Sequence, residues 1–373
     1  MVVVNTYKIR LCRSSYLILF FIFLACCTNQ KQTSSAEVTI LWKDGHAMAI
    51  AIPRSYVEKI NQDSIAQLVS VRLVSPAETA AILGEITFNT NGIEFVPAIP
   101  FTRGLRYEVL VKNDRVAEIE IPEPDPAEAP VLLAVFPSQD TLPLNLLKIY
   151  VQFSKPMAEG QSQKHTVLLK SNGDTARAVF LDLQQELWNA DQTLLTLWLD
   201  PGRIKRDLQP NKLLGNPLQE GEIYTLWISD QWKDLYGAAM QSGYSKHFIV
   251  TSRDSLSPVP VSWTISTPKP GTVNALEINF KEPLDYSLLN AALQVRNAKN
   301  MSITGSIQTR DEERIWQFTP KEPWTEGRYV LQIETRLEDL AGNNINRPFD
   351  RDLKSQNTTL FSEKIVEIPF IVK

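Results

Sequence analysis

The chain has 373 residues, too many for one ordinary hydrophobic core, so we expect two to four domains. Its 43% hydrophobic and 21% charged residues are typical of a folded protein and exclude a disordered one. Three of the 38 basic residues lie in the first 26 positions, so the rest carries 35 basic against 42 acidic residues. This acidic body has no clustered basic face, which argues against nucleic acid as a partner.

The N-terminus has the layout of an export signal. Lys8, Arg10 and Arg13 form a positive segment, and residues 16–25 are an unbroken apolar run. A membrane-spanning helix needs about 20 apolar residues, so this run is too short to span but suits the core of a signal peptide.

The apolar run ends in Phe23-Leu24-Ala25-Cys26, which resembles the lipobox of bacterial lipoproteins. The resemblance implies cleavage before Cys26 and lipid on its thiol and new amino group. We therefore expect a signal peptide over 1–26, a polar tether over 27–36, and a membrane-anchored protein at the outer membrane or cell surface. The alternatives are an ordinary secretory signal or a short uncleaved anchor.

Cysteine usage limits the chemistry of the remaining chain. Cys12, Cys26 and Cys27 are the only cysteines in the sequence. Everything after residue 27 therefore lacks disulfides, a thiolate nucleophile and cysteine metal ligands. We expect each domain to be held by core packing alone.

Two proline-rich stretches divide the chain. They are residues 122–130 and Ser252 to Pro260, and because proline favours extended geometry we interpret both as semi-rigid spacers. They predict domains at 37–121, 131–251 and 261–373.

The strand patterns predict an all-β protein of tandem immunoglobulin-like sandwiches. Apolar residues alternate with polar ones over Leu147 to Phe153 and again over Leu276 to Phe280, and each run ends at a proline turn. Helical stretches are few, and we expect one within Ser55 to Leu68. Short strands separated by turns every 8–12 residues or so suit β-sandwiches.

A glycine-led tyrosine opens an alternating strand three times. The tyrosines are Tyr107, Tyr224 and Tyr329, and the residues two and four positions later are apolar each time. A period of two places these side chains on one face of a sheet. In immunoglobulin-type sandwiches such a tyrosine turns its hydroxyl back onto upstream backbone, so we predict three structural tyrosine corners.

After the tyrosine strand, two modules carry an aspartate–glycine turn. The turns are Asp234-Leu235-Tyr236-Gly237 and Asp339-Leu340-Ala341-Gly342-Asn343. Aspartate bonds backbone two residues on, and glycine supplies a positive φ. With Phe153 to Met157, these turns resemble the SbsA-type Ig-like domain of bacterial surface-layer proteins, more clearly in the second and third modules than in the first.

Residues 130–352 also look like a group of exported bacterial proteins without an assigned activity. The shared phrases include Gln185 to Trp188 and Asp200 to Arg206, and the chain departs at Asn189, where an aspartate would be expected. This resemblance implies the fold and supplies no reaction.

The second module carries an insertion between Leu199 and Gly221. Arg203, Lys205 and Arg206 place three cations there, so the loop could grip an anionic sugar, a phosphate or a partner carboxylate. The structural alternative is that these cations pair with Asp200, Asp207 or the neighbouring domain and fix the angle between modules.

Oxygen ligands gather near the end of the third module. Asp339, Asn343, Asp350 and Asp352 are of the type that calcium prefers, although their spacing matches no EF-hand. A metal site here is a hypothesis that competes with the turn-forming role of Asp339.

Catalysis has little support in the sequence. His46, His165 and His247 lie far apart, and no GxSxG, HExxH or P-loop motif is present. A hydrolase site of His165 with Glu186 and Asp200 is a distant alternative. We predict no enzyme activity and no cofactor, and we interpret Glu312 and Glu313 as a solvated turn.

Eight tryptophans offer another kind of site. Trp188, Trp232 and Trp324 lie near predicted turns, where they could stack on carbohydrate, although core packing is the commoner role. We therefore predict a lipid-anchored envelope protein that acts as a non-catalytic binding or scaffold module. The alternative is a polysaccharide-binding accessory that uses Trp188, Trp232 or the Arg203 loop, and the expected partners are the membrane and an envelope protein or glycan.

Overall fold

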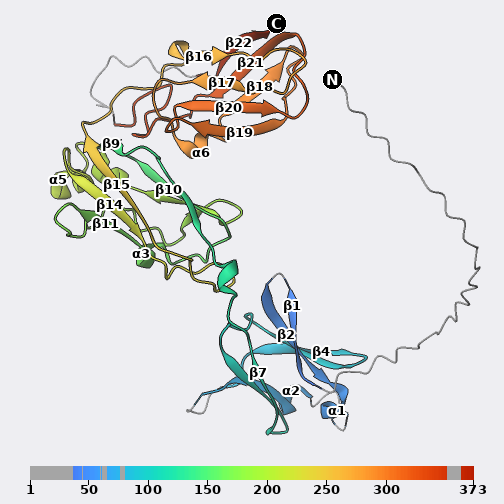
Figure 1. The fold of residues 1–373 in the computed structure, drawn as a ribbon. Helices are drawn as coiled ribbons and strands as arrows, with labels where there is room; N and C mark the ends of the chain where they lie inside the picture. The colour runs from blue at the N-terminus through green and yellow to red at the C-terminus, as the bar shows by residue number, and fades with distance from the viewer. Residues whose placement is uncertain (1–36, 44, 59, 61–64, 76–79, 351–362) are drawn as a thin grey trace, which may run out of the picture.

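The computed structural model describes residues 37–373 except 44, 59, 61–64, 76–79 and 351–362. Three predictions lie outside the described residues: the signal peptide with Cys26, the tether, and Asp352. The chain folds into three successive β-sandwiches, each with its own hydrophobic core, which confirms the predicted fold class (Figure 1). Among the residues described, no helix is long and apolar enough to cross a bilayer.

The first sandwich, which we call domain 1, packs a four-stranded sheet on a three-stranded one. The first sheet has the order β1 (Thr39–Lys43), β2 (His46–Pro53), β5 (Gly92–Pro97), β4 (Gly84–Asn89), and the second β3 (Val69–Leu73), β6 (Arg106–Val111), β7 (Asp114–Glu120). Within Ser55 to Leu68, where a helix was expected, the described residues form two single helical turns, α1 (Arg54–Val57) and α2 (Ile65–Leu68).

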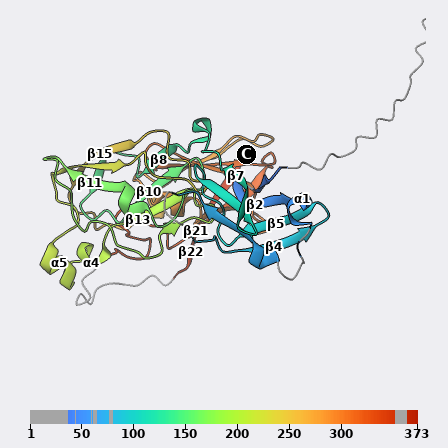
Figure 2. The same ribbon diagram turned by 90° about the horizontal axis from the view of Figure 1, so that it is seen from below.

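The second sandwich, domain 2, has two four-stranded sheets and three short helices. One sheet has the order β12 (Leu187–Trp188), β13 (Leu194–Trp198), β10 (Lys148–Phe153), β8 (Leu132–Phe136), and the other β11 (Thr166–Lys170), β14 (Ile223–Ile228), β15 (Tyr244–Thr251), β9 (Thr141–Pro143). The helices are α3 (Ser162–His165), α4 (Pro201–Ile204) and α5 (Gln209–Leu214). Figures 1 and 2 show α5 at a corner of domain 2 that points away from domain 1.

The third sandwich, domain 3, repeats the plan of the first. One sheet has the order β16 (Thr264–Ser266), β17 (Leu276–Asn279), β20 (Ile315–Pro320), β19 (Gly305–Arg310), and the other β18 (Leu293–Asn297), β21 (Gly327–Glu334), β22 (Ile365–Val372). One short helix, α6 (Tyr286–Leu289), follows the β17 strand.

All three sandwiches share one strand order. The first, second, fifth and fourth strands form one sheet, and the third, sixth and seventh form the other, with β9 as an addition in domain 2. This is the arrangement of constant-type immunoglobulin domains. The three glycine-led tyrosines open the sixth strand each time, as the tyrosine-corner prediction requires.

The tyrosine corners are confirmed. The Tyr107 hydroxyl accepts a hydrogen bond from Thr102 N at 3.0 Å, and the Tyr224 hydroxyl accepts one from Gln219 N at 3.2 Å. The Tyr329 hydroxyl lies 3.2 Å from Thr325 N and donates to the Thr325 carbonyl at 3.1 Å. Each phenol is buried and each hydroxyl has a partner, so the three tyrosines are structural.

The two aspartate–glycine turns also form as predicted. Asp234 Oδ1 accepts hydrogen bonds from Tyr236 N and Ala238 N, and Asp339 Oδ1 accepts them from Ala341 N and Asn343 N. Gly237 and Gly342 follow with φ of +89° and +80°, respectively. The same turn therefore stands at the same end of domains 2 and 3.

Both proline-rich stretches connect successive sandwiches, and hydrogen bonds as well as proline hold each of them. Pro126–Glu128 forms a 3₁₀ turn whose N-cap, Asp125, accepts a hydrogen bond from Ala127 N at 2.8 Å. In the second stretch, Asp254 exchanges two hydrogen bonds with Asn145 of domain 2. The first stretch is thus held by a hydrogen bond of its own, and the second by contacts with domain 2.

The tyrosine corners give a direct test of the repeated fold. Tyr224→Phe removes one hydroxyl and leaves Gln219 N without its partner, so we expect a loss of about 1–2 kcal/mol in the free energy of unfolding. Urea denaturation of the intact chain measures it, and Tyr236→Phe is the control because no hydrogen bond to its hydroxyl is seen among the described residues. Equal stability of Tyr224→Phe and wild type would contradict the structural role of the hydroxyl.

Candidate functional site

The insertion loop of domain 2 is organised around Arg203. Asp200 caps the start of α4 by accepting a hydrogen bond from Gly202 N, and Arg203 in that turn is only 7% exposed. All five N–H bonds of its guanidinium point at backbone carbonyls, those of Arg177, Ala178, Leu214, Gly215 and Asn216. Arg203 therefore holds the loop together from inside. The prediction that it binds an anion was wrong, because all of its guanidinium donors are already used and the side chain is buried.

The other two predicted cations of the loop reach domain 3. The Lys205 ammonium lies 4.2 Å from the centre of the Phe349 ring. Arg206 Nε lies 2.8 Å from Asp350 Oδ2, and Arg253 Nη1 lies 3.2 Å from the same oxygen. Lys205 and Arg206 both contact the neighbouring domain, as expected if the loop cations fix the angle between modules.

A buried carboxylate lies at the centre of the junction between domains 2 and 3. Asp285, only 4% exposed, caps α6 by accepting a hydrogen bond from Leu288 N at 2.9 Å. From domain 2, the Lys148 ammonium approaches Asp285 Oδ2 at 3.0 Å and Glu338 Oε2 at 2.7 Å. The Tyr150 hydroxyl donates to the same Asp285 carboxylate, at 2.7 Å to Oδ2. We call Lys148, Tyr150, Asp285 and Glu338 the junction hub.

The electrostatics of the hub favour a charged Lys148 and a protonated Tyr150, while burial raises the pKa of Glu338 against the attraction of Lys148. Burial alone lowers the pKa of Lys148, but the carboxylates of Asp285 and Glu338 outweigh burial and raise it above its usual value. Burial and the adjacent Asp285 raise the pKa of Tyr150, so its hydroxyl stays protonated and donates. Sequence reasoning missed this hub, and its only signal was a lysine and a tyrosine on the polar face of β10.

Apolar contacts close the junction around the hub. The Phe136 and Tyr286 rings stack with centroids 3.5 Å apart and planes 7° from parallel. Leu340 of domain 3 belongs to the core cluster of domain 2, and its carbonyl accepts a hydrogen bond from Leu147 N at 2.9 Å. The junction thus combines a stacked aromatic pair, a shared core residue and a charged centre.

The β19–β20 turn, predicted to be solvated, is part of the junction. Glu313 is 3% exposed and accepts a hydrogen bond from Ser138 N of domain 2 at 2.8 Å. Arg314 donates to the Gln139 side chain at 3.0 Å. The prediction failed for Glu313 because adjacent acidic residues say nothing about which domain covers the turn.

The predicted calcium ligands have other partners. Asp339 Oδ2 accepts a hydrogen bond from Asn343 Nδ2 at 2.8 Å, and Asn343 Oδ1 accepts one from Phe349 N at 2.9 Å. Asp350 lies between two guanidinium groups, which repel a further cation. Across the part of the chain that the structure describes, no group of three or more His, Cys, Asp or Glu residues could hold a metal ion, and Asp352 lies outside it.

The hydrolase alternative is not supported by the positions of its residues. Glu186 accepts hydrogen bonds from Ser162 N, Gly160 N and Trp188 Nε1, and Asp200 caps α4. His165 stacks on Trp232, which packs on Phe153 at the end of β10, whereas Asp200 follows a strand that ends opposite the start of β10. The length of β10, roughly 17 Å at 3.3 Å per residue, separates them.

The tryptophans proposed for carbohydrate are mostly in cores. Trp232 has no exposed surface and Trp324 is 3% exposed, so neither can stack on a glycan. Trp188 is half-buried, packs on Phe153 and Trp232, and donates its ring N–H to Glu186 at 2.8 Å. The predicted binding role of Trp232 is corrected, since turns of a sandwich also supply core residues.

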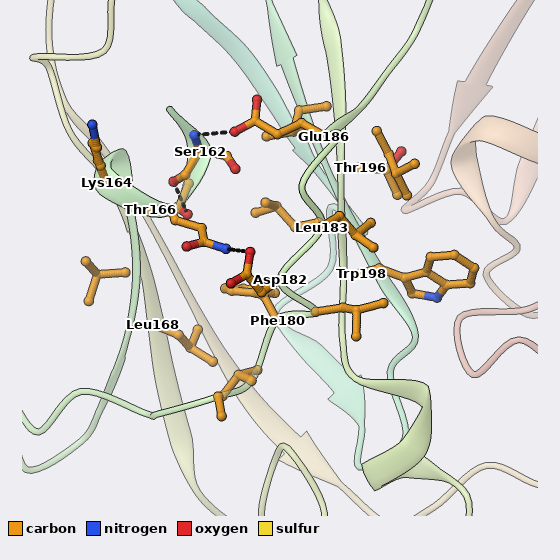
Figure 3. Close-up of a pocket in the computed structure, with 18 of the residues that line it drawn as sticks. Ser162, Lys164, Thr166, Leu168, Phe180, Asp182, Leu183, Glu186, Thr196 and Trp198 are labelled. Carbon is orange, nitrogen blue, oxygen red and sulfur yellow. Dashed lines mark hydrogen bonds between the residues drawn. The ribbon is translucent and has the colours of Figure 1, made fainter. Parts of the chain in front are cut away.

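Two cavities accompany these elements. One, of about 630 Å³, lies between the sheets of domain 2 beside β11 and β13, under residues 178–187 (Figure 3). The other, of about 340 Å³, lies at the junction between Thr141, Arg253 and Asp254 on one side and Glu282 and Leu340 on the other. Arg203, Lys205, Arg206 and Trp188 line neither of them.

Two carboxyl groups at the junction, those of Glu282 and Asp339, have raised pKa values. Burial and the adjacent Asp254 raise the pKa of Glu282 to about 7. Burial and Asp254 also raise the pKa of Asp339 to about 7, against the hydrogen bonds from Asn343. Burial and the nearby Asp254 therefore both favour the neutral form of Glu282.

One comparison with known families agrees with the fold of domain 3. Residues 258–359 match the family described as bacterial Ig-like domain. The N-terminal part of the bacterial S-layer protein SbsC is similar at 14% identity and a TM-score of 0.23, over 66% of this chain and 45% of that one. The chain thus spans less than half of that structure.

Two further solved structures are similar to this chain. Domains MG0-NIE-MG1 of Escherichia coli alpha-2-macroglobulin match at 10% identity and a TM-score of 0.22, over 66% of this chain and 72% of that one. The chicken CNTN1 FN1-FN3 domains match at 10% identity and a TM-score of 0.19, over 90% of this chain and 97% of that one. All three TM-scores lie below 0.5, so these likenesses support no inference about this chain. No curated protein matches the chain.

The raised pKa of Glu282 gives the junction a defined pH dependence. A carboxyl whose pKa rises from 4.5 to about 7 on folding stabilises the folded state at low pH, and this contribution is lost as the pH rises from about 4.5 to 7. Glu282→Gln should therefore stabilise the protein at pH 8, by about 1–2 kcal/mol after allowance for solvent screening, and should leave it unchanged near pH 4.5.

Urea denaturation at pH 4.5 and pH 8 measures the difference. The control is Glu326→Gln, which removes an exposed glutamate of the same domain. A Glu282→Gln variant less stable than wild type at pH 8 would show that the ionised carboxylate stabilises the junction, contrary to this account.

Proposed function

We propose that this protein is an exported, lipid-anchored envelope protein that acts as a non-catalytic scaffold or binding module. Its units are those predicted at residues 37–121, 131–251 and 261–373. One observation carries the proposal: the conspicuous charged groups of domain 2, Lys148, Lys205 and Arg206, are engaged by domain 3.

Engaged charges favour a structural role over a recognition role. A site that binds an anionic ligand must present its cations with open donors, whereas these cations have partners within the chain. Arg253 strengthens the same join, because it donates to the Ile204 carbonyl at 2.9 Å and pairs with Asp350. The match of residues 258–359 to the bacterial Ig-like domain supports the same coarse assignment.

The two junctions differ in their contacts. At the same turn position, domain 3 places Leu340 in the core of domain 2, while domain 2 places Tyr236 beside His46 of domain 1 with ring centroids 4.8 Å apart. Domains 2 and 3 then form a stiff pair, and domain 1 links that pair to the anchor. An envelope protein is the expected partner, and a glycan is the alternative, which would need residues other than Arg203 and Trp232.

Two equivalent glycines test the stiff pair. A methyl group on Gly342 would lie 2.4 Å from Leu147 Cδ2 across the junction, whereas one on Gly237 meets nothing within 4 Å. Both residues have a left-handed backbone, so alanine costs about 1–2 kcal/mol at either site. Gly342→Ala should lose about 1–3 kcal/mol more, because overpacking pushes the domains apart.

Differential scanning calorimetry of the intact chain distinguishes the two outcomes. We expect domains 2 and 3 to unfold in one transition in the wild type and in Gly237→Ala, and in two transitions in Gly342→Ala. Two separate transitions in the wild-type protein would contradict a stiff pair.

The lipid anchor is tested at Cys26. Expressed with its own signal in a bacterium, the wild-type protein should take up radiolabelled palmitate and sediment with membranes. Cys26→Ala should lose the label and the membrane association, while Cys27→Ala should keep both because Cys26 follows the small residue Ala25. An unlabelled wild-type protein in the soluble fraction would favour the ordinary secretory signal instead.

A further inference from the structure

Domain 2 departs from its two neighbours at one edge strand. In domains 1 and 3 the fourth strand is six residues long, β4 and β19, and pairs along the whole fifth strand. In domain 2 the corresponding β12 has two residues, and pairing with β13 covers only Thr196 and Leu195. Before β12, the chain contacts the same edge at Leu181, whose N–H donates to the Trp198 carbonyl at 2.7 Å.

The departure opens the sandwich. Residues 182–186 leave the edge of β13, and the cavity of about 630 Å³ lies behind them, between the two sheets (Figure 3). Its size falls within the range of about 300–1,000 Å³ that is common for small-molecule sites. Its apolar lining comes from both sheets and from the loop itself, through Leu168, Val179, Phe180, Leu183, Leu195 and Leu197.

The mouth of the cavity is held in place by hydrogen bonds. Glu186 accepts them from Ser162 N at 2.7 Å and from Gly160 N at 2.9 Å, which ties the loop to the start of α3. The Gln163 amide donates to Asp182 on the opposite side of the same mouth. A mouth that is already ordered loses little entropy when it binds a ligand.

The charges at the mouth are acidic. Asp182 and Glu186 line it, and neither forms an ion pair with any described residue. Burial raises the pKa of Glu186, but the hydrogen bonds from Ser162, Trp188 and Gly160 outweigh burial and lower it, so the carboxylate stays ionised. Lys164 is the one cation among the lining residues, and Figure 3 shows its ammonium directed away from Asp182.

We propose that this cavity binds a small molecule that combines an apolar body with a single cationic group. The apolar body lies between Leu168 and Leu195, and the cation lies at the mouth beside Asp182 and Glu186, where it supplies the charge that both acids lack. The site is independent of the junction between domains 2 and 3 and of the lipid anchor.

Matched probes test the chemical class. Octyltrimethylammonium and octyl sulfate have the same chain and opposite charge, and isothermal titration calorimetry compares their binding to the intact chain below micelle-forming concentrations. We expect the cationic probe to bind at least tenfold more tightly than the anionic one. Equal binding of the two, or binding of neither, overturns the proposal.

Two variants locate the binding. Asp182→Asn should weaken the cationic probe about fivefold, while Asp174→Asn, an exposed aspartate outside the lining, should leave it unchanged. Leu183→Trp should abolish binding by filling the cavity. Wild-type affinity in Asp182→Asn overturns the assignment of the mouth, and this arm stands even if Leu183→Trp does not fold.

Discussion

The buried carboxylate of Asp285 constrains the orientation of domain 3 on domain 2, and the arrangement of these two domains depends on it. A buried carboxylate costs several kcal/mol unless hydrogen bonds and an opposite charge compensate for it. Its partners come from two domains, since Leu288 N belongs to domain 3 while Lys148 and Tyr150 belong to domain 2. Any rotation of one domain on the other would leave this charge buried and unpaired, so the hub specifies a single orientation.

Orientation and affinity have different sources at this junction. The charged hub contributes little net binding energy, because domain separation would return its groups to water. The stacked Phe136 and Tyr286 rings and the insertion of Leu340 supply the apolar contact that holds the surfaces together. The insertion loop then adds Lys205 and Arg206 at the rim, where exposed charges contribute modestly.

Sequence reasoning succeeded where the interaction is local. The tyrosine corners and the aspartate–glycine turns bond within five residues, so their patterns are visible in the chain. The predicted binding roles of Arg203 and Trp232 were wrong, because the sequence near a turn does not show whether a cation or an indole is buried. The junction hub joins residues 135 or more positions apart and could not be read from one sequence.

The most direct test is whether domains 2 and 3 tumble as one body. Residual dipolar couplings of backbone amides, measured on the intact isotope-labelled chain in a weakly aligning medium, report the alignment of each domain. We expect domains 2 and 3 to fit one alignment tensor in the orientation that the hub specifies, and domain 1 to fit a tensor of different magnitude. Different tensors for domains 2 and 3 would contradict the claim that the Asp285 hub fixes their orientation.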